Sequence, residues 1–166
     1  VVDKSSSDLW SGEEATALFD QLIDLQEKTG ALINISLVIF DYSVHAYQNS
    51  DGDYLCPLDE DLNSKLGEYL KSYSKWYKVD EDGNYVLDSK GNKITEKGEN
   101  YSGGTNADAG LTVAKEILDA HEDVDASRKH VVFISDGLTW LFYEDADDKT
   151  IGVIKYENQT IYRGIS

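Results

Sequence analysis

The sequence predicts an α/β fold with a mostly parallel central sheet flanked by helices. Segments rich in β-branched and apolar residues alternate with segments whose apolar residues recur at helical spacing. This alternation is typical of a parallel sheet with helices on both faces. Asp3 and Asp136 stand at the ends of two strand segments, where such sheets bind ligands. The strand segments are residues 1–3, 32–40 and 130–135, and the helical segments lie between Ser11 and Gly30, over 59–73 and over 106–120.

Each helical segment carries its own signals. Ser11 and Glu14 form an S-x-x-E capping box at the start of the first segment, and Gly30 is suited to end it. The second segment has leucines and a tyrosine on one predicted face, at Leu62, Leu66, Tyr69 and Leu70. The third has its predicted apolar residues at Leu111, Val113, Ala114, Ile117 and Leu118.

The strand segments are short and apolar. Residues 32–40 are too apolar and too rich in β-branched residues for a surface helix, and they predict one buried central strand. Residues 43–48 predict a shorter strand beside it, ending at the turn-forming residues 49–53. Residues 130–135 predict another buried strand, which Asp136 and Gly137 end.

Two segments depart from the alternation. Residues 76–95 predict three short strands joined by Asp-Gly and Gly-Asn turns, which we expect to form an inserted antiparallel arm. Residues 151–165 predict a hairpin that turns at residues 157–159. No internal repeat is evident, and we expect residues 1–166 to form a single domain.

Charge limits the classes of partner. The chain has 32 acidic and 15 basic residues, a formal net charge of -17, so its field repels a phosphate backbone. Nucleic acid is therefore not an expected partner. No apolar run approaches the roughly 20 residues of a membrane span, and we expect none in this segment. The single cysteine, Cys56, cannot form an internal disulfide and is expected to be a buried structural thiol.

Oxygen donors gather at the strand ends and at one glycine-rich loop. Residues 3–7 have the pattern D-x-S-x-S, which places a carboxylate and two hydroxyls on one tight loop. A threonine follows Gly103 and Gly104 at the start of a helical segment. Hard oxygen ligands of this kind are preferred by Mg²⁺ or Mn²⁺ in an octahedral shell, and Ca²⁺ also takes them. The candidate ligands are Asp3, Ser5, Ser7, Thr105 and Asp136.

These motifs, in this order, resemble the von Willebrand factor A family. Its metal ion-dependent adhesion site is built from D-x-S-x-S, a downstream Thr and a further Asp, matched here by residues 3–7, Thr105 and Asp136. The strand ending at Phe40 and Asp41 resembles the family's second strand, and the resemblance covers about residues 1–48 and 102–138. It implies a Rossmann-like fold. Ser6 and Asp8 depart from the family pattern, which often has Gly and usually has Met at these positions.

The resemblance implies a role for each ligand. Ser5, Ser7 and Thr105 would bind the metal directly, while Asp3 and Asp136 would act largely through water or as hydrogen-bond acceptors. An ion with few direct carboxylates stays electrophilic. It can therefore take a Glu or Asp carboxylate of a partner protein as its last ligand.

Together with the inserted arm, the chain resembles the tip adhesins of Gram-positive pili and related cell-wall proteins. This resemblance implies an adhesion domain rather than an enzyme, on the extracellular surface of the cell wall or pilus tip. A host or matrix protein would be the partner. The chain opens in a strand and offers no counterpart of the strand and helix that close the family fold, so we expect it to be part of a longer surface protein.

Three other functions stay open. Asp3 and Asp136 could hold magnesium in a phosphoryl-transfer or hydrolytic enzyme, although Ser5 stands where such enzymes usually have a second Asp. The acidic segments 49–53, 80–84 and 145–148 are candidates for calcium, but they lack the glycine and glutamate positions of a calcium-binding loop. A von Willebrand factor A domain without metal would be a structural spacer.

Overall fold

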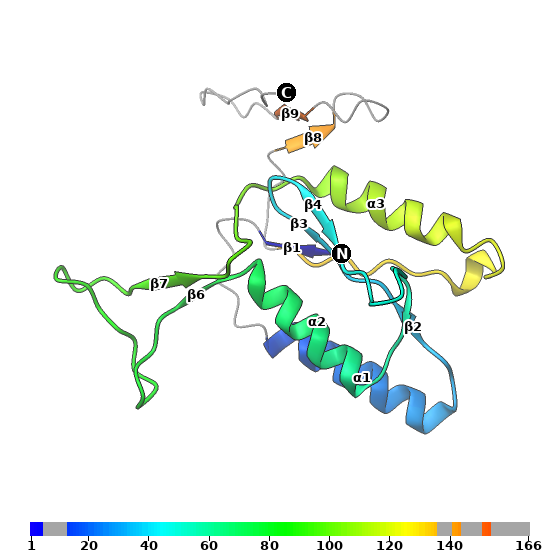
Figure 1. Cartoon of the computed structure of the whole chain (residues 1–166), viewed down its shortest axis with the longest axis horizontal. Helices are drawn as coiled ribbons and strands as arrows, with labels where there is room; N and C mark the ends of the chain where they lie inside the picture. The colour runs from blue at the N-terminus through cyan, green and yellow to red at the C-terminus, as the bar shows by residue number, and fades with distance from the viewer. Residues whose placement is uncertain (5–12, 136–140, 144–150, 154–166) are drawn as a thin grey trace. The chain divides into compact units, whose positions relative to one another are not determined.

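The computed structural model describes residues 1–4, 13–135, 141–143 and 151–153. Within them the chain contains both α-helices and β-strands, as the sequence predicts (Figure 1). The chain divides into two compact units, which are described separately below. The first unit is Val1–Ser5, Asn34–Cys56 and Ser102–Ser166, and the second is Ser6–Ile33 and Pro57–Tyr101. In the described part of the chain, no helix has the length and apolar character needed to cross a membrane.

A small mixed sheet forms the centre of the first unit. Its strands are β1 (Val2–Asp3), β3 (Val38–Phe40) and β4 (Val44–Ala46), in the order β1-β3-β4. β1 runs parallel to β3, with Asp3 opposite Phe40, while β4 runs antiparallel to β3. On the other side of β1, Ile134 forms a parallel bridge to Val2. The carboxyl end of β1 therefore lies between two parallel neighbours, as predicted.

The prediction of one continuous strand over residues 32–40 is wrong. Only β3 is buried along its whole length, whereas β2 (Asn34–Ile35) pairs with β5 (Cys56–Pro57) in a separate two-stranded sheet. Leu32 is exposed. Asn34 and Ser36, which are polar, lie in the part of this segment that is outside the central sheet. The three residues of β3 are all apolar, as expected for a strand that is buried on both faces.

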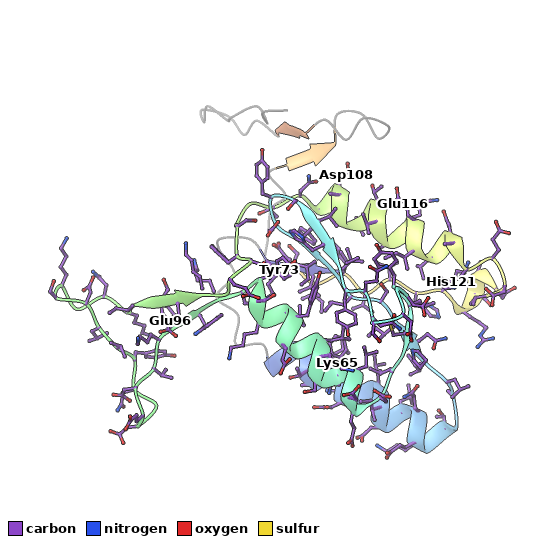
Figure 2. All side chains as sticks on the ribbon, viewed as in Figure 1. Lys65, Tyr73, Glu96, Asp108, Glu116 and His121 are labelled. Atoms are coloured by element: carbon purple, nitrogen blue, oxygen red, sulfur yellow. The ribbon has the colours of Figure 1, made fainter. Side chains whose placement is uncertain are left out.

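Helix α3 (Ala107–Ala120) covers one face of this sheet (Figure 1). Ala114 and Ile117 pack against Val38, as the helical spacing predicts. Leu111 was predicted on the same face but is exposed. Gly110 faces the sheet in its place, and a Cβ there would lie 2.8 Å from Cδ1 of Phe40. The helix thus approaches the strand too closely for a large side chain. Its outer side carries exposed acids, including Asp108 and Glu116 (Figure 2).

Residues 130–135 run beside β1, but they are not buried as predicted. The amide of Ile134 donates to the carbonyl of Val1 at 2.9 Å, and the carbonyl of Ile134 accepts from Asp3 at 2.8 Å. The exposed fractions of residues 131–134 nevertheless range from 38% for Ile134 to 57% for Val132. The physical reason is that this segment pairs with β1 along one edge, and within the described residues no strand pairs with its other edge.

Two helices pack together in the second unit. They are α1 (Glu13–Thr29) and α2 (Glu60–Ser72), and both confirm the sequence prediction. Asp59 caps α2 by accepting a hydrogen bond from the amide of Leu62, and Gly30 ends α1 with a positive φ of 69°. Phe19 of α1 and Leu62, Leu66 and Leu70 of α2 are buried. Ser11 of the predicted capping box lies outside the described residues.

The predicted antiparallel arm follows α2. Its base is formed by β6 (Lys75–Tyr77) and β7 (Thr95–Lys97), which pair antiparallel. The predicted middle strand makes only isolated bridges, between Val79 and Tyr85 and between Leu87 and Lys93. Glu96 lies at the base (Figure 2). Its carboxylate accepts from the ammonium of Lys78 at 3.0 Å and from the indole of Trp76 at 3.3 Å.

The three segments of the arm are joined by a closed ring of backbone hydrogen bonds. The amide of Lys78 donates to Ile94, that of Ile94 donates to Val86, and that of Val86 donates back to Lys78, at 2.9, 2.9 and 3.0 Å. The backbone of the arm therefore satisfies much of its hydrogen bonding within itself.

A five-residue turn occurs three times, although no repeat was evident in the sequence. It spans residues 49–53, 80–84 and 88–92, and in each copy the first residue is Asp or Asn and the fourth is Gly. In each copy the side-chain oxygen of the first residue accepts the amides of the third and fifth residues, at 2.8–3.0 Å. The glycine at the fourth position has a positive φ in all three copies. Glycine adopts this backbone conformation without steric cost, which explains why the fourth position is always glycine.

The remaining described elements are short. A 3₁₀ helix, η1, spans Ala126–Arg128. Strands β8 (Leu141–Tyr143) and β9 (Ile151–Val153) pair antiparallel. The hairpin predicted over residues 151–165 thus begins with a strand that pairs with residues 141–143, and residues 154–166 lie outside the described part.

We predict that the arm contributes little to stability. Replacing residues 79–93 by Asn-Gly should change the free energy of unfolding by less than about 1 kcal/mol, or the Tm by less than roughly 2–4 °C. The reason is the closed hydrogen bonding of the arm. Thermal unfolding followed by circular dichroism tests this, with the buried Leu66→Ala as a control that should cost about 2–5 kcal/mol. A loss as large as that of Leu66→Ala would show that the arm is part of the core.

Candidate functional site

Asp3 is held at the carboxyl end of β1 by both neighbouring segments. Its amide donates to the carbonyl of Ile134 at 2.8 Å, and the next amide, that of Lys4, donates to Phe40 at 2.9 Å. The side chain is only 3% exposed. Its Oδ2 accepts the hydroxyl of Ser135 at 2.7 Å. A buried carboxylate requires such partners because ionised oxygens are costly to remove from water.

Thr105 lies in a loop that is pressed against the end of β3. The loop begins with Gly103 and Gly104, whose φ values are +79° and +87°. The carbonyl of Gly103 accepts from the amide of Tyr42 at 2.5 Å. A Cβ on Gly104 would lie 2.7 Å from Cα and 2.8 Å from N of Tyr42. Glycine is thus required at this position by both the backbone angle and the space. Thr105 itself is 5% exposed.

Asn106 links this loop to α3. Its side-chain oxygen caps the helix by accepting the amide of Ala109 at 3.1 Å, and its own amide donates to the carbonyl of Asp41 at 2.8 Å. Asn106 is fully buried. Its Nδ2 has no hydrogen-bond acceptor among the described residues.

Asp41 is a residue that the sequence analysis placed at a strand end without giving it a role. It is 0% exposed and follows β3 directly. Its Oδ2 accepts the hydroxyl of Ser102 at 2.6 Å, and its Oδ1 accepts the amide of Ser43 at 2.8 Å. The one available signal was its position at a strand end, because a carboxylate there is often functional.

The structure brings two of the five predicted ligands to the same edge of the sheet. Asp3 is paired opposite Phe40, and Thr105 precedes Asn106, which is bonded to Asp41. Asp3 and Thr105 therefore flank the end of β3. Ser135, which contacts Asp3, immediately precedes the fifth predicted ligand. Ser5, Ser7 and Asp136 lie outside the described residues.

Lys4, the basic residue of the D-x-S-x-S loop, is 2% exposed. A buried ammonium is stable only with polar partners of its own. Lys4 therefore does not display its charge on the surface. Within the described residues, no three His, Cys, Asp or Glu side chains form a group that could hold a metal.

The acidic turns are a poorer choice for a cation. In the turn 80–84, Oδ1 of Asp80 already accepts the amides of Asp82 and Asn84 at 3.0 and 2.8 Å. In the turn 88–92, Oδ1 of Asp88 accepts two amides in the same way, and the hydrogen bond from the amide of Asn92 is the main cause that lowers the pKa of Asp88. These side chains stabilise turns, which favours the structural interpretation of the calcium candidates 49–53 and 80–84. The candidate 145–148 lies outside the described residues.

Ser43, His45 and Asp41 are neighbours but do not have the geometry of a hydrolytic triad. His45 Nε2 lies 3.0 Å from Oγ of Ser43 and 3.5 Å from Oδ1 of Asp41. The hydroxyl and the carboxylate thus approach the same ring nitrogen. In a triad the carboxylate orients one nitrogen while the other accepts the nucleophile's proton.

Cys56 is buried and not in a disulfide, as expected. Burial raises the pKa of its thiol, and the nearby carboxylate of Asp53 raises it further. A thiol that resists ionisation is a poor nucleophile and a poor metal ligand. Cys56 is therefore structural.

Comparisons with known proteins give no relative for this chain: no family model, no curated protein and no solved structure matches it.

We predict that Gly104→Ala is much more damaging than Gly83→Ala. Both glycines have a similar positive φ, +87° and +82°, so each substitution costs about 1–2 kcal/mol of backbone strain. Gly83 has open space around it, whereas Gly104 abuts the backbone of Tyr42. Gly104→Ala should lose roughly 1–3 kcal/mol more. Urea unfolding of the two variants measures the difference. Equal losses would mean that the loop does not lie against Tyr42.

Proposed function

We propose that this chain is a metal-dependent protein-binding domain of the von Willebrand factor A type. It binds Mg²⁺ or Mn²⁺ through Asp3, Ser5, Ser7, Thr105 and Asp136. One observation carries the proposal: Asp3 and Thr105 are both buried at the carboxyl edge of the sheet and flank the end of β3. They are 102 positions apart in sequence, and a shared site explains why both polar side chains are placed there.

The chemistry of the donors supports magnesium or manganese. The five side chains offer carboxylate and hydroxyl oxygens and no sulfur or nitrogen, which is the choice of hard cations. Asn106 Nδ2, beside Thr105 in the chain, is a buried donor for which a ligand or water oxygen would be a suitable acceptor. Calcium, which accepts more oxygens at longer distances, is the alternative ion.

The charge of the chain explains why a metal would be needed for adhesion. At a net charge of -17, the field of the molecule repels an acidic partner. A bound divalent ion concentrates positive charge at one point. The carboxylate of a partner's Glu or Asp can complete its coordination there.

We place this activity on a cell surface. The inserted arm and the acidic composition are the features that resemble pilus tip adhesins and cell-wall proteins of Gram-positive bacteria. The partner would be a host or matrix protein.

The first prediction of this proposal is a single divalent metal site. Titration calorimetry should detect binding of Mn²⁺ or Mg²⁺ by the wild-type chain. Asp3→Asn should abolish binding, because the amide keeps an oxygen for the Ser135 hydroxyl but loses the negative charge. Asp80→Asn, in an exposed acidic turn, is the matched control and should bind like the wild type. Unchanged affinity in Asp3→Asn would place the ion elsewhere. If the wild type binds no metal, the remaining interpretation is a structural spacer domain.

The second prediction is that adhesion requires the metal. Binding to a partner selected from host matrix proteins should disappear in EDTA and return with Mg²⁺ or Mn²⁺. Thr105→Ala should weaken binding about 30- to 1,000-fold, or roughly 2–4 kcal/mol, because a ligand hydroxyl is lost. Thr105→Ser keeps the hydroxyl and should retain most of the affinity. Surface plasmon resonance with and without EDTA measures this. Equal affinities in the two buffers would refute metal-bridged recognition.

A further inference from the structure

The side chain of Asp41 is enclosed within the fold, and both of its oxygens accept hydrogen bonds. It is 0% exposed. Oδ1 accepts the amide of Ser43 at 2.8 Å and its hydroxyl at 3.3 Å. Oδ2 accepts the hydroxyl of Ser102 at 2.6 Å, across 61 positions of sequence. Both oxygens therefore accept hydrogen bonds from this chain's own donors.

The backbone around Asp41 is bonded to the same loop. Its carbonyl accepts the amide of Asn106 at 2.8 Å, and the amide of Tyr42 donates to Gly103 at 2.5 Å. With the bond from Ser102, these contacts hold the loop at residues 102, 103 and 106. Only Gly104 and Thr105 lie between the held positions, and Gly104 rests against the backbone of Tyr42.

This loop needs such support. Residues 103 and 104 are successive glycines with positive φ, and glycines have many accessible backbone conformations when tertiary contacts are absent. Ordering each residue costs about 1–2 kcal/mol of conformational entropy. If the loop were ordered only when metal binds, that cost would be subtracted from the binding energy. A loop that is already fixed avoids this loss.

We propose that Asp41 is a positioning residue that fixes the Thr105 hydroxyl in place for the metal. The inference rests on the proposed metal site, and it adds a residue that makes no contact with the ion. Its action is through geometry, because the carboxylate anchors Ser102 on one side of Thr105 while its backbone carbonyl anchors Asn106 on the other.

The test compares two substitutions of Asp41. Asp41→Ala removes both side-chain contacts and should weaken Mn²⁺ binding roughly 10- to 100-fold, as losses of supporting residues around metal sites do. Asp41→Asn keeps the shape and an acceptor for Ser43, and its amide can donate to the Ser102 hydroxyl in reverse. It should therefore bind Mn²⁺ nearly as well as the wild type, although its negative charge is gone.

A matched control separates positioning from general destabilisation. Asp59 caps α2 with a hydrogen bond of 2.7 Å to the amide of Leu62, in the second unit. Asp59→Ala should lower the Tm but leave the Mn²⁺ affinity of the folded protein unchanged. Amide hydrogen exchange in metal-free protein gives a second readout. The amide of Asn106 should exchange faster in Asp41→Ala than in Asp59→Ala or the wild type.

The possible results are distinct. If the wild type binds Mn²⁺ and Asp41→Ala binds it equally well, Asp41 has no positioning role and the proposed function stands. If Asp41→Asn is as weak as Asp41→Ala, charge rather than position is responsible, and the inference is wrong. If the wild type binds no Mn²⁺, the inference and the proposed function fail together. Should Asp41→Ala not fold, Ser102→Ala replaces it, since it removes only the 2.6 Å bond to Oδ2. Unchanged affinity in that variant would equally overturn the inference.

Discussion

A carboxylate removed from water must find hydrogen-bond donors, and in this chain that requirement organises the edge of the sheet. Asp41 follows the most buried strand, β3, and is itself fully buried. Its donors come from the turn after β3 and from a loop 61 positions later, at Ser43 and Ser102. Satisfying this one side chain brings the glycine-rich loop against the end of β3. The start of α3 and the placement of Thr105 follow from that contact.

Elements with strong local signals could be predicted from the sequence. Asp59 and Asn106 cap α2 and α3 where the helical spacing begins, and Gly30 ends α1. The parallel pairing of β1 and β3 also agrees with the alternation of strands and helices. The pairing of β1 with β3 joins residues far apart in the chain, whereas the helix caps and the helix end depend on residues close together. Local sequence is sufficient for them because caps, turns and helical faces are decided within a few residues.

Burial could not be predicted in the same way. Residues 32–40 were expected to form one strand, but only Val38–Phe40 belongs to the central sheet. Residues 130–135 have an apolar pattern, yet Val132 is largely exposed, because burial depends on which strand lies alongside. In the candidate site, too, residues in short local motifs could be predicted and residues with distant partners could not. Asp3 and Thr105 were predicted from short motifs, whereas Asp41 was given no role because its partner Ser102 is distant in the sequence. Ser5, Ser7 and Asp136 lie outside the described residues, so their contribution still rests on the sequence pattern.

The central claim is that a divalent cation binds at the sheet edge rather than at the many exposed acids. Paramagnetic line broadening by substoichiometric Mn²⁺, in a two-dimensional amide NMR spectrum, tests this most directly because the effect is confined to residues near the ion. The account predicts that broadening is strongest for Asp3, Tyr42 and residues 104–106, and that EDTA reverses it. Broadening centred on the acidic turns 49–53, 80–84 or 88–92, with the sheet edge unaffected, would contradict it.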